Sequence, residues 1–303
     1  LSLFERAGFF RADNRLRAKS FHKISHKVYA LVIDYSSEVL YMRIVYLSKA
    51  KTARLLLVAC LVMVSLLFLD NNYGEEVRET AAVFLNPRKE LPIYSVDTEE
   101  KKIAISFDAA WGSEYTVKIM DILEERDIKT TFFLVGFWVD KYPERVKEIA
   151  ARGHEVGNHS TTHPEMSKLG KDQMISEVMT TQKKIEELAG DRAVRLIRPP
   201  FGDYNDLLIR TCRELDFYPI QWDVDSLDWK EEGVQPVVDR VTKKVRNGSI
   251  VLFHNNAKYI TEALPLILDH LLAEGYTIVP ISELIYKENY RMDHTGRQIK
   301  VGS

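Results

Sequence analysis

Two histidines lie four residues apart in the segment His159-Ser-Thr-Thr-His163. This spacing corresponds to about one turn of a helix, so both imidazoles can face one metal ion from the same side of such a turn. An isolated pair with this spacing is more often an exposed coincidence than a metal site. The metal interpretation therefore depends on which other groups the fold brings beside the pair.

Three more ionisable residues lie next to apolar or stiff segments, where their side chains can do acid–base chemistry or hold a group that does. Asp108 ends an apolar run and is a candidate general base, with a helix N-cap as the alternative. Arg198 precedes two prolines that stiffen the turn, which suits a fixed guanidinium that grips a carboxylate; the alternative is a surface arginine. His254 follows another apolar run and is either a core histidine or a general acid that a carboxylate such as Asp228 keeps protonated.

The elements that must position these residues are short β-branched segments separated by stretches with helical apolar spacing. Seven strands are predicted, at residues 103–107, 131–135, 155–157, 194–197, 218–222, 249–253 and 277–279. Apolar residues at helical spacing lie between them, for example over residues 115–123, 174–188 and 264–271. Parallel strands need such crossovers, so the alternation predicts an α/β domain with a mainly parallel sheet, either open or closed into a barrel.

The functional face of a parallel α/β fold is the face where its strands end. Five of the seven predicted strands deliver ionisable residues at that end, namely Asp108, His159 with His163, Arg198, Asp225 with Asp228, and His254. Surface charges scattered along the chain would not favour that end of the strands. The convergence therefore predicts a single active site, with the two histidines as metal ligands.

The net charge and the absence of one motif argue against two other classes of function. The 303 residues are 46% hydrophobic and 28% charged, enough for one good-sized core and an appendage. A net charge of -2 gives no broad basic surface for phosphate backbones, which excludes a nucleic-acid partner. The G-x-S-x-G elbow of serine hydrolases is absent from the sequence, which disfavours that chemistry.

An uncharged run, Leu55–Leu69, predicts the compartment of the protein. It is short for a membrane-spanning helix, which needs about 20 residues, and comes nearer to the hydrophobic region of a signal peptide. No small-x-small cleavage pattern follows it, so we expect an uncleaved signal anchor; a cleaved peptide and a buried core helix are the alternatives. The basic residues before the run predict that residues 70 onward face outside the cytoplasm; they are Lys49, Lys51 and Arg54.

We therefore expect a single-pass protein of the cell membrane with an extracytoplasmic catalytic domain. The expected segments are a cytoplasmic or upstream segment at 1–52, the anchor helix at 53–70, a stalk at 71–100, the catalytic domain at 101–290 and a C-terminal tail at 291–303. Met42 heads the basic stretch before the anchor and is a candidate natural start, so residues 1–41 receive no function.

Five motifs occur in one order over about residues 100 to 290. They are Ser106-Phe-Asp108, His159-Ser-Thr-Thr-His163, Arg198-Pro-Pro-Phe-Gly202, Asp225-Ser-Leu-Asp228-Trp229 and Leu252-Phe-His254. In these motifs the chain resembles the polysaccharide deacetylases with a NodB homology domain, carbohydrate esterase family 4. The resemblance implies a distorted (β/α) barrel of about seven parallel strands and metal-assisted hydrolysis of N-acetyl groups on peptidoglycan or a chitin-like glycan. Residues 107–112 and 254–259 resemble the subgroup associated with bacterial spore formation.

The resemblance also implies a role for each residue of the motifs. It makes Asp108 the base that activates water, Arg198 the group that orients this base, and His254 the acid that protonates the leaving amine. Asp228 would tune the charge of His254. The backbone N–H of Phe201 would help to hold the oxyanion.

The remaining roles concern a metal ion and the acetyl pocket. His159 and His163 would hold a divalent ion, zinc or a similar metal such as cobalt, which polarises the acetyl carbonyl and acidifies the attacking water. Trp229 and Leu252 would line the acetyl pocket.

One position departs from the family pattern. The family commonly has a second aspartate directly after the base as a metal ligand, and here that position is Ala109. Catalytic zinc usually has three protein ligands, so two histidines alone should bind metal more weakly. Glu114 is one candidate substitute ligand, although the preferred interpretation of this residue is an acid in the first turn of the next helix. Asp203 and Asp225 are the other candidates. The departure supports an alternative function, a catalytically impaired glycan-binding or structural wall protein.

Overall fold

The computed structural model describes residues 28–34, 41–47, 54, 56–58 and 89–302. The chain forms two compact units, Leu1–Arg88 and Lys89–Ser303. In the first unit, β1 (Val28–Asp34) and β2 (Tyr41–Leu47) pair in antiparallel fashion. Most of the expected anchor, residues 53–70, lies outside the described residues. Within the described ones, no helix is both long enough and apolar enough to cross a bilayer.

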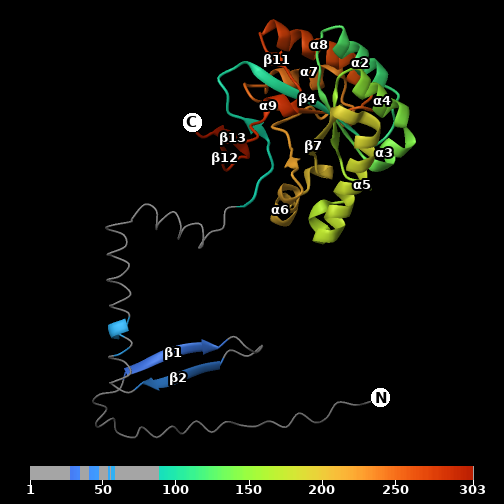
Figure 1. The fold of residues 1–303 in the computed structure, drawn as a ribbon. Coiled ribbons are helices and arrows are strands. Elements are labelled where there is room, and N and C mark those ends of the chain that lie inside the picture. Colours follow the sequence, from blue (N-terminus) through green and yellow to red (C-terminus); the bar gives the residue numbers. More distant parts are fainter. Residues whose placement is uncertain (1–27, 35–40, 48–53, 55, 59–88, 303) are drawn as a thin grey trace, which may run out of the picture. The chain divides into compact units, whose positions relative to one another are not determined.

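The second unit is built on a sheet of eight parallel strands (Figure 1). The strands are β4 (Lys102–Ala109), β5 (Thr131–Leu134), β6 (Glu155–Asn158), β7 (Ala193–Ile197), β8 (Tyr218–Pro219), β9 (Val224–Asp225), β10 (Ile250–His254) and β11 (Thr277–Ile278). Their order is β8-β7-β6-β5-β4-β10-β9, and β11 pairs with the first residues of β4. Because β8 and β9 are edge strands, the sheet is an open half-barrel, which confirms the predicted parallel α/β class.

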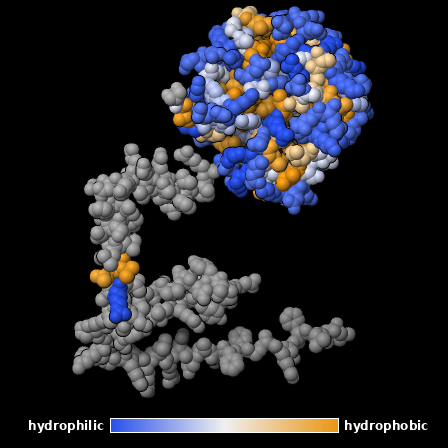
Figure 2. Space-filling view, in the orientation of Figure 1, coloured by the Kyte–Doolittle hydropathy of each residue, from blue (hydrophilic) through white to orange (hydrophobic). Residues whose placement is uncertain are grey.

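Helices connect successive strands and cover the sheet (Figure 1). They are α2 (Thr116–Glu124), α3 (Gly136–Lys141), α4 (Pro143–Ala151), α5 (Lys171–Ala189), α6 (Asp206–Glu214), α7 (Val234–Thr242), α8 (Ile260–Ala273) and α9 (Ile281–Leu284). The helices predicted over residues 115–123, 174–188 and 264–271 are α2, α5 and α8. Figure 2 shows that the visible surface of this unit is largely hydrophilic, with hydrophobic residues in small groups.

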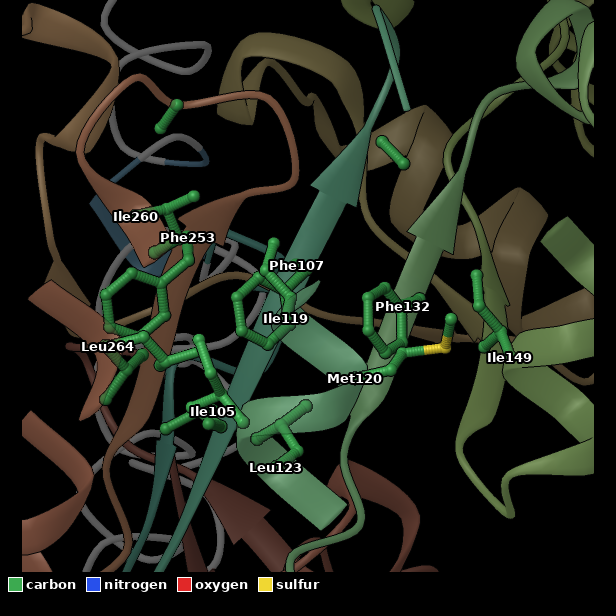
Figure 3. Packing of buried hydrophobic residues seen from close by; sticks show 14 of the residues in the cluster. Ile105, Phe107, Ile119, Met120, Leu123, Phe132, Ile149, Phe253, Ile260 and Leu264 are labelled. Atoms are coloured by element: carbon green, nitrogen blue, oxygen red, sulfur yellow. The ribbon is translucent and has the colours of Figure 1, made fainter. Parts of the chain in front are cut away.

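The main core lies between the sheet and its helices and fixes the strands that carry the active-site residues. The ring of Phe107 on β4 stacks between Phe132 on β5 and Phe253 on β10, with centroid separations of 5.1 and 5.6 Å (Figure 3). All three rings are fully buried. Burying a side chain of this size stabilises the fold by about 1.5–3 kcal/mol. The stack holds β4 and β10 in a register that sets Asp108 opposite His254.

The strand predicted at residues 218–222 is wrong in its extent. β8 ends at Pro219, and the chain then crosses to the other edge of the sheet to form β9. Two hydrogen bonds direct this crossing: the backbone N–H of Gln221 donates to the carbonyl of Ile93 (2.7 Å), and the carboxylate of Asp223 accepts from the backbone N–H of Ile250 (2.9 Å). The predicted number of about seven strands therefore becomes eight.

Parts of the segments assigned to the stalk and the tail form a small sheet. β3 (Ser95–Val96) pairs in parallel with β13 (Arg297–Lys300), and β13 pairs in antiparallel fashion with β12 (Tyr290–Met292). Residues 89–100 and 291–302 thus belong to the same compact unit as the catalytic domain.

Candidate active site

A cavity of about 510 Å³ opens at the carboxyl ends of the strands. It is lined by Asp108, Ala110, Trp111, His159, His163, Phe201, Trp222, Asp225, Trp229, Leu252, His254 and Asn256. The ionisable residues predicted to converge therefore line one cavity or contact a residue that does. Because Asp225 ends β9, this residue and Asp228 reach the site from an edge strand rather than from the strand predicted at 218–222.

Asp108 is held at the end of β4 by a buried arginine. Arg198, which is fully buried, donates from Nη1 to Oδ1 of Asp108 (2.8 Å) and from Nη2 to the carbonyl of Gln221 (3.2 Å). The grip on the carboxylate is thus a single hydrogen bond, and Oδ2 faces Nε2 of His159 at 3.5 Å. Burial alone would raise the pKa of Asp108, but the charges of Arg198 and, to a smaller extent, His254 hold it below its usual range. Asp108 is therefore ionised at neutral pH and can accept a proton through Oδ2.

His254 lies at the end of β10 and is paired with a buried carboxylate. Its Nδ1 lies 2.7 Å from Oδ1 of Asp228, and its backbone N–H donates to Oδ2 of the same residue (2.8 Å). Burial lowers the pKa of His254, but the hydrogen bond and the charge of Asp228 outweigh it, so the pKa is raised above its usual value. Since Nδ1 is engaged, Nε2 is the ring atom free to donate a proton.

The two histidines of the HxxxH motif lie close together, but the predicted helical turn is wrong. Residues 159–163 form a loop after β6, in which Ser160 (φ 68°) and His163 (φ 59°) have left-handed backbone conformations. The rings are edge to face with centroids 5.0 Å apart. Asn158 supports the turn, since its Oδ1 accepts from the backbone N–H of Ser160 (2.9 Å).

Both histidines are in the protonation state that a metal ligand requires. Nδ1 of His159 bonds to the carbonyl of Arg198 (2.6 Å), so Nδ1 carries the proton and Nε2 keeps a free lone pair. Burial lowers the pKa of His159, and it also lowers the pKa of His163 to about 4, so both rings are neutral near pH 7. The pair is therefore suited to supply two nitrogen ligands.

A third protein ligand is not in place. Ala109 is fully buried in the apolar core, and the carboxylate of Glu114 folds over Gly112. Asp203 accepts from the backbone N–H of Ser167 (2.8 Å). Over residues 89–302 and the other described segments, no three His, Cys, Asp or Glu side chains are grouped to hold a metal ion. The donor set does not fit a catalytic zinc site with three protein ligands.

The structure also shows where Glu114 and Asp225, two of the candidate third ligands, lie. α2 begins at Thr116 and has no acid in its first turn, so the interpretation of Glu114 as a first-turn helix acid is wrong. Asp225 is the one candidate that lines the cavity, and its Oδ1 accepts from the backbone N–H of Leu227 (2.9 Å).

The three predicted substrate-binding residues all line the cavity. Leu252 is buried in its wall, whereas Phe201 and Trp229 are exposed at its rim. Trp229 lies on a short 3₁₀ turn, Asp228–Lys230, whose flanking residues Leu227 (φ 54°) and Glu231 (φ 55°) are both left-handed. This strained turn directs Asp228 inward to His254 and leaves Trp229 exposed at the rim.

Sequence reasoning missed the aromatic residues that hold Arg198. Its guanidinium carbon lies 4.2 Å from the ring centroid of Phe133 and 5.5 Å from that of Trp222, so two rings stabilise the buried cation. Trp222 falls in the segment predicted as a strand. The sequence signal for this contact was Trp222 itself, an aromatic residue between two polar residues at the end of the predicted strand.

Comparisons with known proteins agree with this geometry. A family model described as polysaccharide deacetylase matches residues 95–220. The chain is 34% identical to a peptidoglycan-N-acetylglucosamine deacetylase of Bacillus cereus, over 63% of this chain and 92% of that protein. It is 32% identical to the uncharacterized protein YlxY of Bacillus subtilis, over 67% of this chain and 63% of that protein, and so spans less than two thirds of YlxY.

Solved structures with the same fold include one described as a pseudoenzyme. The wild-type carbohydrate esterase family 4 pseudoenzyme of Bacillus anthracis is similar with a TM-score of 0.62 and 32% identity, over 70% of this chain and 73% of that one. A mutant of the same pseudoenzyme, described as having restored enzymatic activity, also has a TM-score of 0.62, with 36% identity over 64% of this chain and 71% of that one.

Proposed function

Since the chain belongs to the polysaccharide deacetylase family, we propose that its second unit hydrolyses N-acetyl groups on a cell-wall polysaccharide of the peptidoglycan type. One observation carries the proposal. Asp108 and His254 face the same cavity from neighbouring strands, and each has its own buried partner, Arg198 and Asp228 respectively. The arrangement supplies an ionised base and a protonated acid on the two sides of a bound amide.

The reaction uses the free atoms of these two residues. Oδ2 of Asp108 accepts a proton from water while the water oxygen attacks the acetyl carbonyl carbon. In the collapse of the tetrahedral intermediate, Nε2 of His254 donates its proton to the departing nitrogen and the C–N bond breaks. The products are acetate and a free amine on the sugar. Phe201 at the rim is suited to contribute its backbone N–H to the oxyanion, and Leu252 to contact the acetyl methyl group.

The test measures acetate released by the full-length protein from N-acetylated peptidoglycan and chitin oligosaccharides, with and without added divalent metal. We expect release by the parent and loss by about 10²-fold or more in Asp108→Asn, because an amide cannot accept the proton from water. Unchanged melting of the variant is the control for folding. Release by Asp108→Asn above about 10% of the parent rate would remove Asp108 from the role of base.

A second candidate function is favoured by the incomplete ligand set. A chain that keeps the cavity and its aromatic rim but lacks a third metal ligand would bind glycan without efficient hydrolysis, as a wall-binding or structural factor. The similarity to a Bacillus anthracis pseudoenzyme supports this alternative. Binding of N-acetylated glycan without acetate release, at saturating zinc or cobalt, favours it over the deacetylase.

We also propose that the protein is anchored in the cell membrane with its second unit outside the cytoplasm. The proposal rests on the uncharged run Leu55–Leu69 and the basic residues before it. Protease treatment of intact protoplasts should digest the second unit. Protection of this unit from the protease, or its release as a trimmed soluble form, contradicts the proposal.

A role in spore formation is the most specific part of the proposal. It rests on the resemblance of the segments 107–112 and 254–259 to a sporulation-associated subgroup. We expect expression to begin during sporulation, and a transcription time course measures this. Expression confined to vegetative growth contradicts it.

A further inference from the structure

Asn255 directly follows His254, the last residue of β10, and its side chain is fully buried. It is not among the residues that line the cavity, whereas the next residue, Asn256, is. The proposed reaction therefore gives Asn255 no direct contact with the substrate. A fully buried amide destabilises the fold unless hydrogen bonds offset the loss of its hydration. The hydrogen bonds of Asn255 thus indicate what this residue does.

The backbone of Asn255 joins the ends of the two strands that carry the base and the acid. Its N–H donates to the carbonyl of Asp108 (3.1 Å), directly after the position where His254 and Asp108 are register partners. This bond extends the pairing of β4 and β10 to the last residues of both strands. The main chains of the base and of the acid are therefore linked through Asn255.

The side chain of Asn255 binds the loop that follows β4. Its Nδ2 donates to the carbonyl of Gly112 (2.9 Å) and to Oγ1 of Thr116 (3.1 Å), the first residue of α2. Nε1 of Trp138 on α3 donates to the same Gly112 carbonyl (2.6 Å). Gly112 has a φ of +62°, a conformation that residues other than glycine rarely adopt. The loop after Asp108 is thus held from two sides, and Asn255 provides the side that belongs to β10.

The oxygen of the same amide shows what this position requires. Oδ1 of Asn255 is buried and has no hydrogen-bond partner within the described part of the chain. A buried acceptor without a partner destabilises the fold, so packing alone would favour an apolar residue of similar size, such as leucine. Leucine could not make the two bonds that Nδ2 donates. We therefore attribute the amide at this position to its donor bonds.

The reaction depends on how far the base lies from the acid. Asp108 and His254 act on one amide, and a misplacement of about 1 Å can lower the rate of such a step by about 10²-fold. Arg198 bonds to Asp108, and Asp228 bonds to His254, but neither partner bonds to both. Asn255 is attached to both, because it follows His254 in the chain and bonds to Asp108 and to the loop after it.

We propose that Asn255 is a positioning residue that holds the base and the acid at the separation that the reaction needs. The proposal rests on the proposed function, because it takes Asp108 and His254 to act on one acetamide group. It adds that loss of the Asn255 amide slows the chemical step without changing the protonation of either group.

The test compares acetate release by the full-length parent, Asn255→Leu and Asn255→Ser from chitin oligosaccharides, well below the melting temperature of each protein. Leucine keeps the volume and removes both donor bonds. Serine is too short to bond to both Gly112 and Thr116, and it decides the test if the leucine variant does not fold. We expect kcat to fall by about tenfold or more in both variants, while KM changes by less than about threefold. The limits of the pH profile should stay in place, because Arg198 and Asp228 are unchanged.

Trp138→Phe is the matched control, because it removes the other donor to the Gly112 carbonyl and leaves the ends of β4 and β10 as they are. It should lower the melting temperature but keep kcat within about twofold of the parent. A parent-like kcat in the folded Asn255 variants, or an equal loss of kcat in Trp138→Phe, overturns the positioning role. A shifted pH profile in the Asn255 variants also contradicts it.

Crystal structures of the parent and of the same Asn255 variants separate this proposal from the deacetylase. They give the distance from Oδ2 of Asp108 to Nε2 of His254 and require no activity. If the parent releases no acetate, the deacetylase fails, and a distance that differs by about 1 Å in the variants still supports the positioning role. An unchanged distance contradicts the positioning role, whether or not the parent is active.

Discussion

Replacing Asp228 by Asn should lower the pKa of His254 and move the alkaline limit of activity to lower pH. In the parent, Oδ1 of Asp228 lies 2.7 Å from Nδ1 of His254, and Oδ2 accepts from the backbone N–H of the same residue. An asparagine at this position has one oxygen, so it can accept only one of these two donors. The amide also carries no charge to stabilise the imidazolium.

The size of the shift follows from the lost interaction. A hydrogen bond to a charged group contributes about 1.5–3 kcal/mol, and one pKa unit corresponds to about 1.36 kcal/mol, so the pKa of His254 should fall by about 1–2 units. The acid must be protonated to donate, so activity is present below its pKa and lost as pH rises through it. Because the pKa of Asp108 is held below its usual range, the base stays ionised in mildly acidic solution. The variant should therefore recover towards the parent rate as pH is lowered.

Two measurements test this reasoning. The first is acetate release as a function of pH, and the second is an NMR titration of the His254 imidazole, which does not require an active enzyme. Asp225→Asn is the matched control, since it removes a carboxylate from the same cavity that acts on His254 only through its charge. Its shift should be smaller. If Asp228→Asn leaves both the alkaline limit and the imidazole titration where they are in the parent, Asp228 does not tune the acid.

Three further predictions concern other buried groups. Arg198→Lys should raise the pKa of Asp108 and move the acid limit of activity to higher pH, because a single ammonium cannot hydrogen-bond to both Asp108 and the carbonyl of Gln221. An acid limit that stays at the parent's pH contradicts this prediction. Ala109→Asp should tighten zinc binding, measured by competition with a chelator, because it adds a third protein ligand. It should also lower the melting temperature of the metal-free protein, because a carboxylate replaces a fully buried methyl group. Unchanged zinc affinity would refute the prediction, and Glu114→Gln, which should not change the affinity, is the control. Burial lowers the pKa of His154 in the folded protein to about 4. As pH falls, His154 is therefore protonated in the unfolded chain before it is protonated in the folded one, which lowers the free energy of unfolding. From pH 7 to pH 5 the parent should lose about 2 kcal/mol more in urea unfolding than His154→Gln does, and equal losses would contradict this.

The sequence determined the fold class and most of the active site because both depend on local patterns. Alternating apolar runs and amphipathic stretches predict a parallel sheet, and the end of each strand then identifies Asp108, His159, Arg198 and His254 as neighbours. Strand ends in a parallel sheet must meet on one face, so this grouping needs no knowledge of packing.

The tertiary structure decided what depends on contacts between distant segments. The segment 218–222 has strand propensity, yet its strand ends at Pro219, and hydrogen bonds from Gln221 to Ile93 and from Ile250 to Asp223 direct the chain to the other edge of the sheet, where residues 224–225 form β9. The His159 to His163 spacing suits a helix, but the bond from Ser160 to Asn158 helps to fold it as a loop.

The ligand set shows the same division at the level of side chains. The sequence revealed that Ala109 replaces a carboxylate, but only the packing showed that Glu114 turns to Gly112 instead of the histidines. Likewise, Gly112 and Trp138 are 26 residues apart in the chain, and a hydrogen bond from Nε1 of Trp138 to the carbonyl of Gly112 joins them. Sequence patterns report the preference of each segment for a helix or a strand. Which exposed rings and which charges come together depends on long-range packing, which no local pattern encodes.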